Sequence, residues 1–184
     1  EITIHAGATE ALCATFLALL APGDEAIVFE PFYDAYLPGI ALAQAKARIV
    51  PLAPPDFRLD PKALEAAVSP KTRLLVLNSP GNPSGRVFTR EELAAIAAVC
   101  VKRDLLVVTD EVYEHIVFDG AHLPIATLPG MRDRTVTLSS AGKTFSLTGW
   151  KVGWSCAAPA LAAAVRSVHQ FVTFTVATPF QHAV

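Results

Sequence analysis

Lys143 is the residue of this 184-residue sequence whose setting most clearly indicates chemistry. It stands among small residues just after the apolar run Thr135–Ser139, which is predicted to be a buried strand. A lysine at the tip of such a strand is expected to be a buried amine with a lowered pKa, and a neutral amine is a nucleophile. Lys151 follows eight residues later and could supply a second cation to the same site. The alternative is that Lys151 is an ordinary solvated lysine on the surface.

The triplet Gly142-Lys143-Thr144 also allows a different class of function, nucleotide hydrolysis at a phosphate-binding loop. That motif requires a glycine five residues before Gly142, and Thr137 stands there, inside the predicted strand. The sequence therefore favours the nucleophilic amine over nucleotide hydrolysis.

A carboxylate ends another predicted strand. Asp110 follows the apolar run Leu105–Thr109. Burying a carboxylate costs free energy unless a cation or a hydrogen-bond donor meets it, so Asp110 is expected to have such a partner and a functional role. Glu111 and Glu114 are instead expected to be helix-start or surface charges.

Two stretches of backbone could approach a ligand closely. Gly7-Ala8-Thr9-Glu10 leads into a helix, where small residues and free N–H groups favour an anion such as phosphate. An ordinary N-cap at Thr9 is the alternative. The segment Asn78–Gly85 is rich in Pro and Gly and predicts a rigid loop that can direct the Asn82 amide toward a ligand, although an ordinary turn would also fit.

These residues must be positioned by alternating strands and helices. Short apolar runs predict strands at Ile2–His5, Ala26–Phe29, Arg48–Leu52, Leu74–Asn78, Leu105–Thr109, Thr135–Ser139 and Gly153–Ala157. Stretches of helical period lie at Glu10–Leu20, Pro61–Val68, Glu91–Lys102 and Ala160–Gln170. This order predicts an α/β fold with a mainly parallel seven-stranded sheet and helices on both faces. In such sheets ligands bind beyond the carboxyl ends of the strands, so the polar strand ends should face one crevice.

Composition excludes several other classes of protein. With 52% hydrophobic and 17% charged residues the chain is not disordered, and a net charge of −2 gives no footprint for nucleic acid. The three cysteines form no CxxC pair, which favours a reducing, cytoplasmic setting, and no metal site is predicted. No export signal or membrane span is recognisable. Because the chain starts without Met and both ends lie in apolar sequence, it is expected to be a piece of a longer protein.

Six segments in this order resemble the class I/II aminotransferases that use pyridoxal phosphate (PLP), of fold type I. They are Gly7-Ala8-Thr9-Glu10-Ala11-Leu12, Glu30-Pro31-Phe32-Tyr33, Asn78 to Gly85, Thr109-Asp110-Glu111-Val112-Tyr113, Ser140-Ala141-Gly142-Lys143-Thr144-Phe145 and Gly149-Trp150-Lys151-Val152-Gly153. The chain is most similar to the branch with kynurenine/glutamine transaminases and bacterial methionine aminotransferases, as Val168-His169-Gln170-Phe171 also indicates. The resemblance spans essentially the whole chain.

The resemblance implies a role for each residue around the cofactor ring. Lys143 matches the catalytic lysine that holds PLP as a Schiff base and later moves a proton. Asp110 matches the carboxylate that pairs with the pyridinium nitrogen. Asn82 and Tyr113 match the two donors to the phenolate oxygen, and Tyr33 matches the aromatic residue that stacks on the ring.

The resemblance also implies a phosphate-binding group. Ala8 and Thr9, through their backbone N–H groups, match it together with Ser140 and Lys151. Many relatives have arginine in place of Lys151, and a lysine gives a point charge rather than a bidentate clamp. Ser84 replaces the commoner threonine of the Asn-Pro-Thr-Gly turn.

By this resemblance, residues 1–184 are the PLP-binding large domain of a homodimeric enzyme, without its N-terminal segment and C-terminal small domain. The implied reaction passes an amino group from an amino acid of methionine, glutamine or aromatic type to a 2-oxo acid by a ping-pong mechanism. Two alternatives remain open: a PLP-dependent carbon–sulfur β-lyase on the same scaffold, and a non-catalytic sensor domain of a transcription regulator. The isolated fragment is expected to be inactive, because the arginine that binds the substrate carboxylate would lie past Val184.

Overall fold

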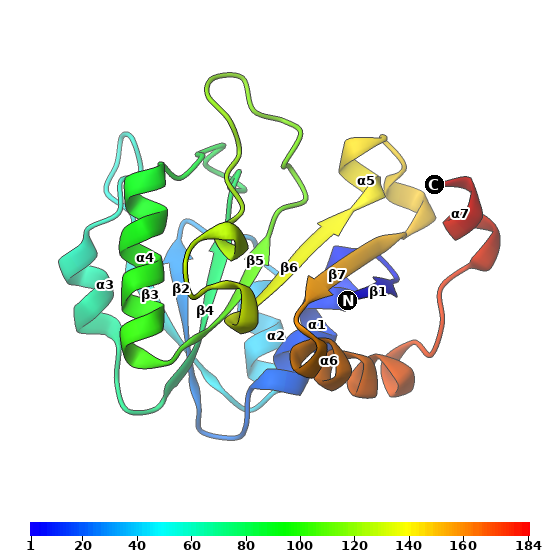
Figure 1. Ribbon diagram of the computed structural model, residues 1–184, viewed down its shortest axis with the longest axis horizontal. Coiled ribbons are helices and arrows are strands. Elements are labelled where there is room, and N and C mark those ends of the chain that lie inside the picture. Colours follow the sequence, from blue (N-terminus) through cyan, green and yellow to red (C-terminus); the bar gives the residue numbers. More distant parts are fainter.

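A computed structural model describes all residues from 1 to 184, and seven strands form one sheet in the order β1-β7-β6-β5-β4-β2-β3 (Figure 1). The strands are β1 (Ile2–His5), β2 (Glu25–Glu30), β3 (Lys46–Pro51), β4 (Thr72–Asn78), β5 (Leu106–Asp110), β6 (Thr135–Ser140) and β7 (Gly153–Ala157). The helices are α1 (Ala8–Leu19), α2 (Tyr36–Leu42), α3 (Pro61–Ala67), α4 (Arg90–Arg103), α5 (Ala141–Thr144), α6 (Pro159–Val172) and α7 (Thr178–Ala183). Short 3-10 helices cover Ile125–Thr127, Arg132–Arg134 and Thr148–Trp150.

The sheet is mainly parallel, as the sequence predicts. Strands β3, β2, β4, β5 and β6 run parallel, whereas β7 runs antiparallel to both of its neighbours, β1 and β6. Because β1 pairs only with β7, the two ends of the strand sequence lie side by side, with His5 opposite Gly153. This pairing places the chain after His5 next to the chain before Gly153.

The seven predicted strands and four predicted helices are confirmed, with ends that differ by two residues or fewer. The short helices α2, α5 and α7 were not predicted. Helix α2 contains Pro38 and Gly39, which disfavour a helix on local grounds. Gly39 is needed for packing, because a Cβ there would lie 2.6 Å from Cδ2 of Phe16 in α1.

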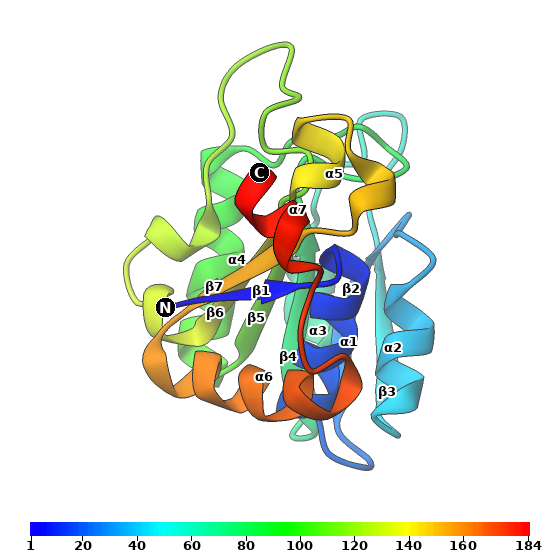
Figure 2. The same ribbon diagram turned by 90° about the vertical axis from the view of Figure 1, so that its right-hand side faces the viewer.

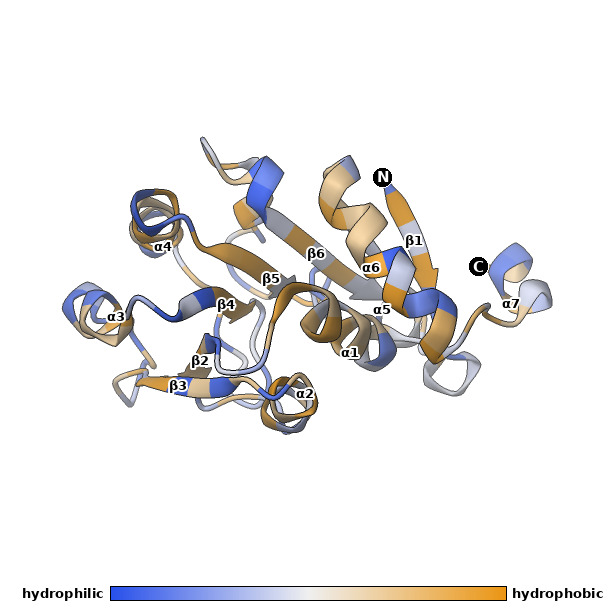
Figure 3. Ribbon diagram, turned by 90° about the horizontal axis from the view of Figure 1, so that it is seen from below, coloured by the Kyte–Doolittle hydropathy of each residue, from blue (hydrophilic) through white to orange (hydrophobic).

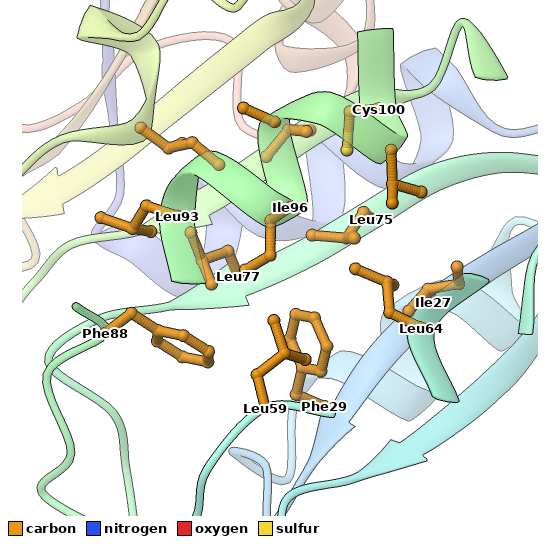
Figure 4. Close-up of a cluster of buried hydrophobic side chains, with 14 of the residues drawn as sticks. Ile27, Phe29, Leu59, Leu64, Leu75, Leu77, Phe88, Leu93, Ile96 and Cys100 are labelled. Atoms are coloured by element: carbon orange, nitrogen blue, oxygen red, sulfur yellow. The ribbon is translucent and has the colours of Figure 1, made fainter. Parts of the chain in front are cut away.

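Helices cover both faces of the sheet (Figure 3). Helices α3 and α4 lie on one face, over a core cluster of 18 buried residues that includes Leu64, Ile96 and Phe29 (Figure 4). Helices α1 and α2 lie on the other face, over a second cluster of 14 residues that includes Phe16 and Tyr36. The strands between these layers are apolar on both sides, which is why their sequences lack polar alternation.

Local signals set the helix ends. At α4, the side chain of Thr89 accepts a hydrogen bond from the Glu92 N–H (3.3 Å), and Glu92 accepts one from the Thr89 N–H (3.0 Å), which forms the predicted capping box. At α3, Asp60 caps the first turn and Pro61 stands at its start. Neither these helices nor any other combines the length and the apolar character that crossing a membrane requires.

Candidate active site

A cavity of about 680 Å³ opens at the carboxyl ends of the parallel strands, where the fold predicts a ligand. The structure brings all nine residues singled out from the sequence into its wall. They are Ala8, Thr9, Tyr33, Asn82, Asp110, Tyr113, Ser140, Lys143 and Lys151. They stand on segments that follow β1, β2, β4, β5 and β6 or precede β7, so the sheet order alone gathers them.

One end of the cavity is the start of helix α1. The N-cap position is Gly7, with φ 84° and ψ 170°, and no side chain caps the helix. The alternative reading of Thr9 as the N-cap is therefore wrong. The N–H groups of Ala8 and Thr9 have no partner within a helix, so they are free to bind an anion.

Close packing against β7 holds this turn in place. A Cβ on Gly153 would lie 2.7 Å from the carbonyl carbon of Gly7 and 2.9 Å from the Ala8 nitrogen, so only glycine fits there. Lys151, exposed and in the left-handed conformation (φ 53°), runs its side chain past Gly7. Ser140 accepts a hydrogen bond from the Gly142 N–H (3.1 Å) at the start of α5. Two helix starts, a hydroxyl and a cation thus surround this end.

A buried carboxylate marks another part of the wall. Asp110 is 4% exposed and accepts hydrogen bonds from Tyr36 Oη (2.9 Å) and, more weakly, from the Val112 N–H (3.4 Å). Burial raises the pKa of Asp110 from 3.8 to about 6, against these hydrogen bonds. The expected hydrogen-bond donor is therefore present, but no cation pairs with the carboxylate, which leaves it suited to a cationic ligand atom.

Asn78 ties the Pro- and Gly-rich loop to the backbone of Asp110. Its amide nitrogen donates to the carbonyl oxygens of Asp110 (2.8 Å) and Pro80 (3.2 Å), and its Oδ1 accepts from the Asn82 N–H (2.7 Å). Asn78 and Tyr36 are the residues that sequence reasoning missed. Asn78 lies inside a recognised segment and could have been found, whereas nothing local connects Tyr36 with Asp110.

Lys143 differs from its expectation in one respect. It lies on the four-residue helix α5 directly after β6, and its side chain is exposed rather than buried. Its Nζ lies 5.9 Å from the centroid of the Tyr113 ring, so the amine and this phenol share one side of the cavity. The side chain is exposed because the cavity into which it projects is open to solvent.

The expectation for Glu111 is wrong. Glu111 is 1% exposed, and its carboxylate pairs with His122 Nε2 (2.7 Å) and with Thr109 Oγ1 (3.0 Å). Its side chain lies on the side of Thr109, which faces away from Asp110 because successive residues of β5 alternate. Glu114, half-buried, accepts a hydrogen bond from Ser139 Oγ (2.6 Å).

The wall of the cavity is complementary to PLP. Free helix N–H groups and Lys151 suit its phosphate, the buried Asp110 suits its ring nitrogen, and the Lys143 amine suits its aldehyde. The fold and the three groups at this edge of the sheet thus fit a PLP-binding domain.

The chain belongs to the aminotransferase class I and II family, which matches residues 1–184. Members of this family depend on PLP. The probable N-succinyldiaminopimelate aminotransferase DapC of Mycobacterium tuberculosis is 51% identical over 187 residues, covering 100% of this chain and 47% of the relative. The solved structure of N-succinyldiaminopimelate aminotransferase from that organism superposes with a TM-score of 0.98 at 50% identity, covering 100% of this chain and 48% of that one.

Two further relatives belong to the branch indicated by the sequence. Kynurenine–oxoglutarate transaminase 3 of Homo sapiens is 45% identical over 194 residues, covering 100% of this chain and 43% of the relative. Methionine aminotransferase of Escherichia coli is 46% identical over 185 residues, covering 100% of this chain and 48% of the relative. The chain thus spans about half the length of the curated relatives it matches.

Proposed function

We propose that residues 1–184 are the PLP-binding large domain of an aminotransferase that moves an amino group from an amino acid to a 2-oxo acid. The observation that carries this proposal is that Lys143 and Asp110 face one cavity with the free start of α1. An N-terminal segment and a C-terminal small domain would complete the enzyme, consistent with a match to about half of each relative.

When bound, PLP supplies an electron sink for the negative charge that develops at the substrate Cα. Asp110 would pair with the ring nitrogen and so keep that nitrogen protonated. The buried Tyr36 hydroxyl keeps the carboxylate oriented. Lys143 would hold the cofactor through its aldehyde carbon, and the Lys143 Nζ, when free, would carry the proton removed from the substrate Cα.

The other residues of the wall bind and orient. Asn82 and Tyr113 donate hydrogen bonds to the phenolate oxygen, and Tyr33 stacks on the ring. Asn82 is held for this role by the bond from its backbone N–H to Asn78. The N–H groups of Ala8 and Thr9, with Ser140 and Lys151, bind the phosphate.

Substrate choice follows from the relatives only as a class. The names of the relatives include N-succinyldiaminopimelate, kynurenine–oxoglutarate and methionine aminotransferases. We propose an amino acid of methionine, glutamine or aromatic type, with an N-succinylated diamino acid as the competitor to test. The free cysteines at 13, 100 and 156 fit a cytoplasmic setting. The exposed side chains of Phe118, Phe171 and Phe174 fit a homodimer.

The test is reduction of the full-length protein with borohydride in the presence of PLP, followed by peptide mapping. We expect the label on Lys143 and none after Lys143→Arg, with Lys102→Arg on the exposed face of α4 as the matched control. Label at another lysine, or none, would contradict the proposal. A panel of amino acids with 2-oxoglutarate then measures transamination, and release of ammonia and pyruvate without an oxo acid would indicate a β-lyase instead.

A further inference from the structure

Two histidines and a glutamate form a buried cluster beside the phosphate-binding end of the cavity. His5 Nδ1 lies 2.8 Å from Glu10 Oε2, and His169 Nδ1 lies 3.0 Å from Glu10 Oε1. The side chains are 0%, 8% and 10% exposed for His5, Glu10 and His169. Each oxygen of one carboxylate is therefore held by a different imidazole ring.

The spacing within this cluster is that of hydrogen bonds. Ligand atoms around a tetrahedral zinc ion lie about 3.3 Å apart, given metal–ligand bonds of about 2.0–2.1 Å. The contacts of 2.8 and 3.0 Å are shorter and match hydrogen bonds to a charged acceptor. The His5 ring is also held on its other side, since its Nε2 contacts Ser155 Oγ (2.9 Å), whereas His169 Nδ1 itself contacts Thr173 Oγ1 (3.0 Å) in addition to Glu10. The cluster thus links β1, α1, β7 and α6.

Glu10 controls the turn that leads into α1. Its Oε2 accepts a hydrogen bond from the Ala6 N–H (3.2 Å), and the Gly7 N–H is taken by the His5 carbonyl oxygen (2.8 Å). A usual capping side chain would occupy the N–H groups of the first turn. Glu10 instead binds the N–H before the turn, which fixes the backbone while leaving the N–H groups of Ala8 and Thr9 free.

The two histidines also compensate an unfavourable charge. Glu10 lines the cavity, where its negative charge would repel a phosphate. Burial acts to raise the pKa of Glu10, but hydrogen bonds from His5 and His169 outweigh it and lower the pKa, so the carboxylate is ionised. Donation by both rings draws this charge away from the start of α1.

We propose that Glu10, oriented by His5 and His169, is a positioning residue that sets the affinity of the α1 start for the phosphate of the cofactor. This inference rests on the proposed function. It adds His169, a residue of α6 that is far from the others in sequence, to a phosphate site that otherwise consists of the α1 start, Ser140 and Lys151. If this role is specific to the phosphate, variants that lose it will bind PLP more weakly. They will bind pyridoxal, which lacks the phosphate, as tightly as wild type does.

The experiment measures dissociation constants of the full-length protein for PLP and for pyridoxal, by titration of absorbance. For His5→Ala and His169→Ala, which keep the charge of Glu10 but remove one of its two compensating donors, we expect PLP to bind at least tenfold more weakly and pyridoxal within twofold of wild type. His169→Asn keeps a donor near the Nδ1 position and should restore part of the PLP affinity. Glu111→Gln is the matched control, because it disrupts another buried carboxylate–histidine pair on the same sheet and should leave the ratio unchanged.

Equal weakening of both ligands, or an equal change in the ratio for Glu111→Gln, would overturn the inference. If His5→Ala fails to fold, the pair His169→Ala and His169→Asn decides the question alone. Unchanged ratios in variants of a protein that binds PLP would refute this inference and leave the proposed function standing. A wild-type protein that binds neither ligand would overturn both.

Discussion

The phenolic Oη of Tyr36 lies 2.9 Å from Oδ2 of Asp110, and both side chains are almost fully buried. Burial and the charge of Asp110 raise the pKa of Tyr36 well above 10, so the phenol remains a donor. Tyr36 begins α2, and Asp110 ends β5, on the same side of the sheet. A helix that the local sequence disfavours thereby delivers the hydrogen bond that holds the central carboxylate.

Replacing Tyr36→Phe removes this donor. Because the bond favours the ionised form, its loss should raise the pKa of Asp110 and destabilise the cofactor-free protein by about 1–2 kcal/mol above pH 6. Urea unfolding at pH 5 and pH 8 measures the difference, which should be smaller at pH 5. Tyr33→Phe is the control, since Tyr33 makes no hydrogen bond to Asp110, and an equal loss in both variants would contradict this account.

Asp110→Asn should stabilise the cofactor-free protein at neutral pH. The pKa of Asp110 is about 6 in the folded protein against 3.8 ordinarily, so the folded state holds this proton more tightly. The free energy of unfolding therefore falls as pH rises from about 4 to about 6, by on the order of 3 kcal/mol. The variant should lack that fall and unfold at higher urea concentration at pH 7, while losing transamination. Identical pH profiles for wild type and variant would rule out this assignment of the titrating group.

Gly153→Ala should disrupt the phosphate-binding end. The new Cβ would lie under 3.0 Å from the backbone of Gly7 and Ala8, so strand β7 and this turn must separate, at a cost of about 1–3 kcal/mol. We expect weaker PLP binding together with a lower melting temperature. Gly149→Ala, where a Cβ meets nothing within 4 Å, should leave both quantities near wild type. Comparable effects at positions 149 and 153 would argue against a steric cause.

The 184-residue chain on its own should bind PLP weakly and catalyse no measurable transamination. No arginine lines the cavity, and its two lysines are assigned to the aldehyde and the phosphate, so the substrate carboxylate lacks a partner. Phe118, Phe171 and Phe174 are 98%, 85% and 73% exposed, which predicts self-association. Size-exclusion chromatography and a turnover assay beside the full-length protein measure both. Robust turnover by a monomeric chain would refute the prediction.

Much of the fold could be predicted because most strands are short apolar runs, and because capping residues and prolines mark the ends of several helices. Thr89 and Glu92 mark the start of α4 in the sequence as clearly as in the structure. Helix α2 could not be predicted, because its stability comes from Gly39 packing on Phe16 rather than from its own residues. The stacking of the Trp150 and Phe180 rings is equally invisible in the sequence. This contact joins α7 to the 3-10 helix Thr148–Trp150, and Figure 2 shows α7 beside the segment that follows α5.

The candidate site was predicted where a single segment carries the signal and missed where two distant segments combine. Lys143 and Asp110 each follow an apolar run, so position alone identified them. The bond between Tyr36 and Asp110 joins residues 74 positions apart, and that between Glu10 and His169 joins residues 159 apart. The burial of Glu111 was missed for a different reason, because its partner His122 lies 11 residues later in the irregular connection after β5, where no periodic pattern indicates which side chains meet.

The pairing of β1 with β7 has a consequence for biosynthesis. During synthesis, strand β1 cannot pair with its neighbour in the sheet until residues 153 to 157 of β7 have been made. Until then the α1 start lacks the backbone that packs against Gly7, and the nascent polypeptide holds an unfinished pocket. The turn at the start of α1 can therefore reach its final packing only after translation has passed β7, so we expect cofactor binding to follow synthesis of that strand.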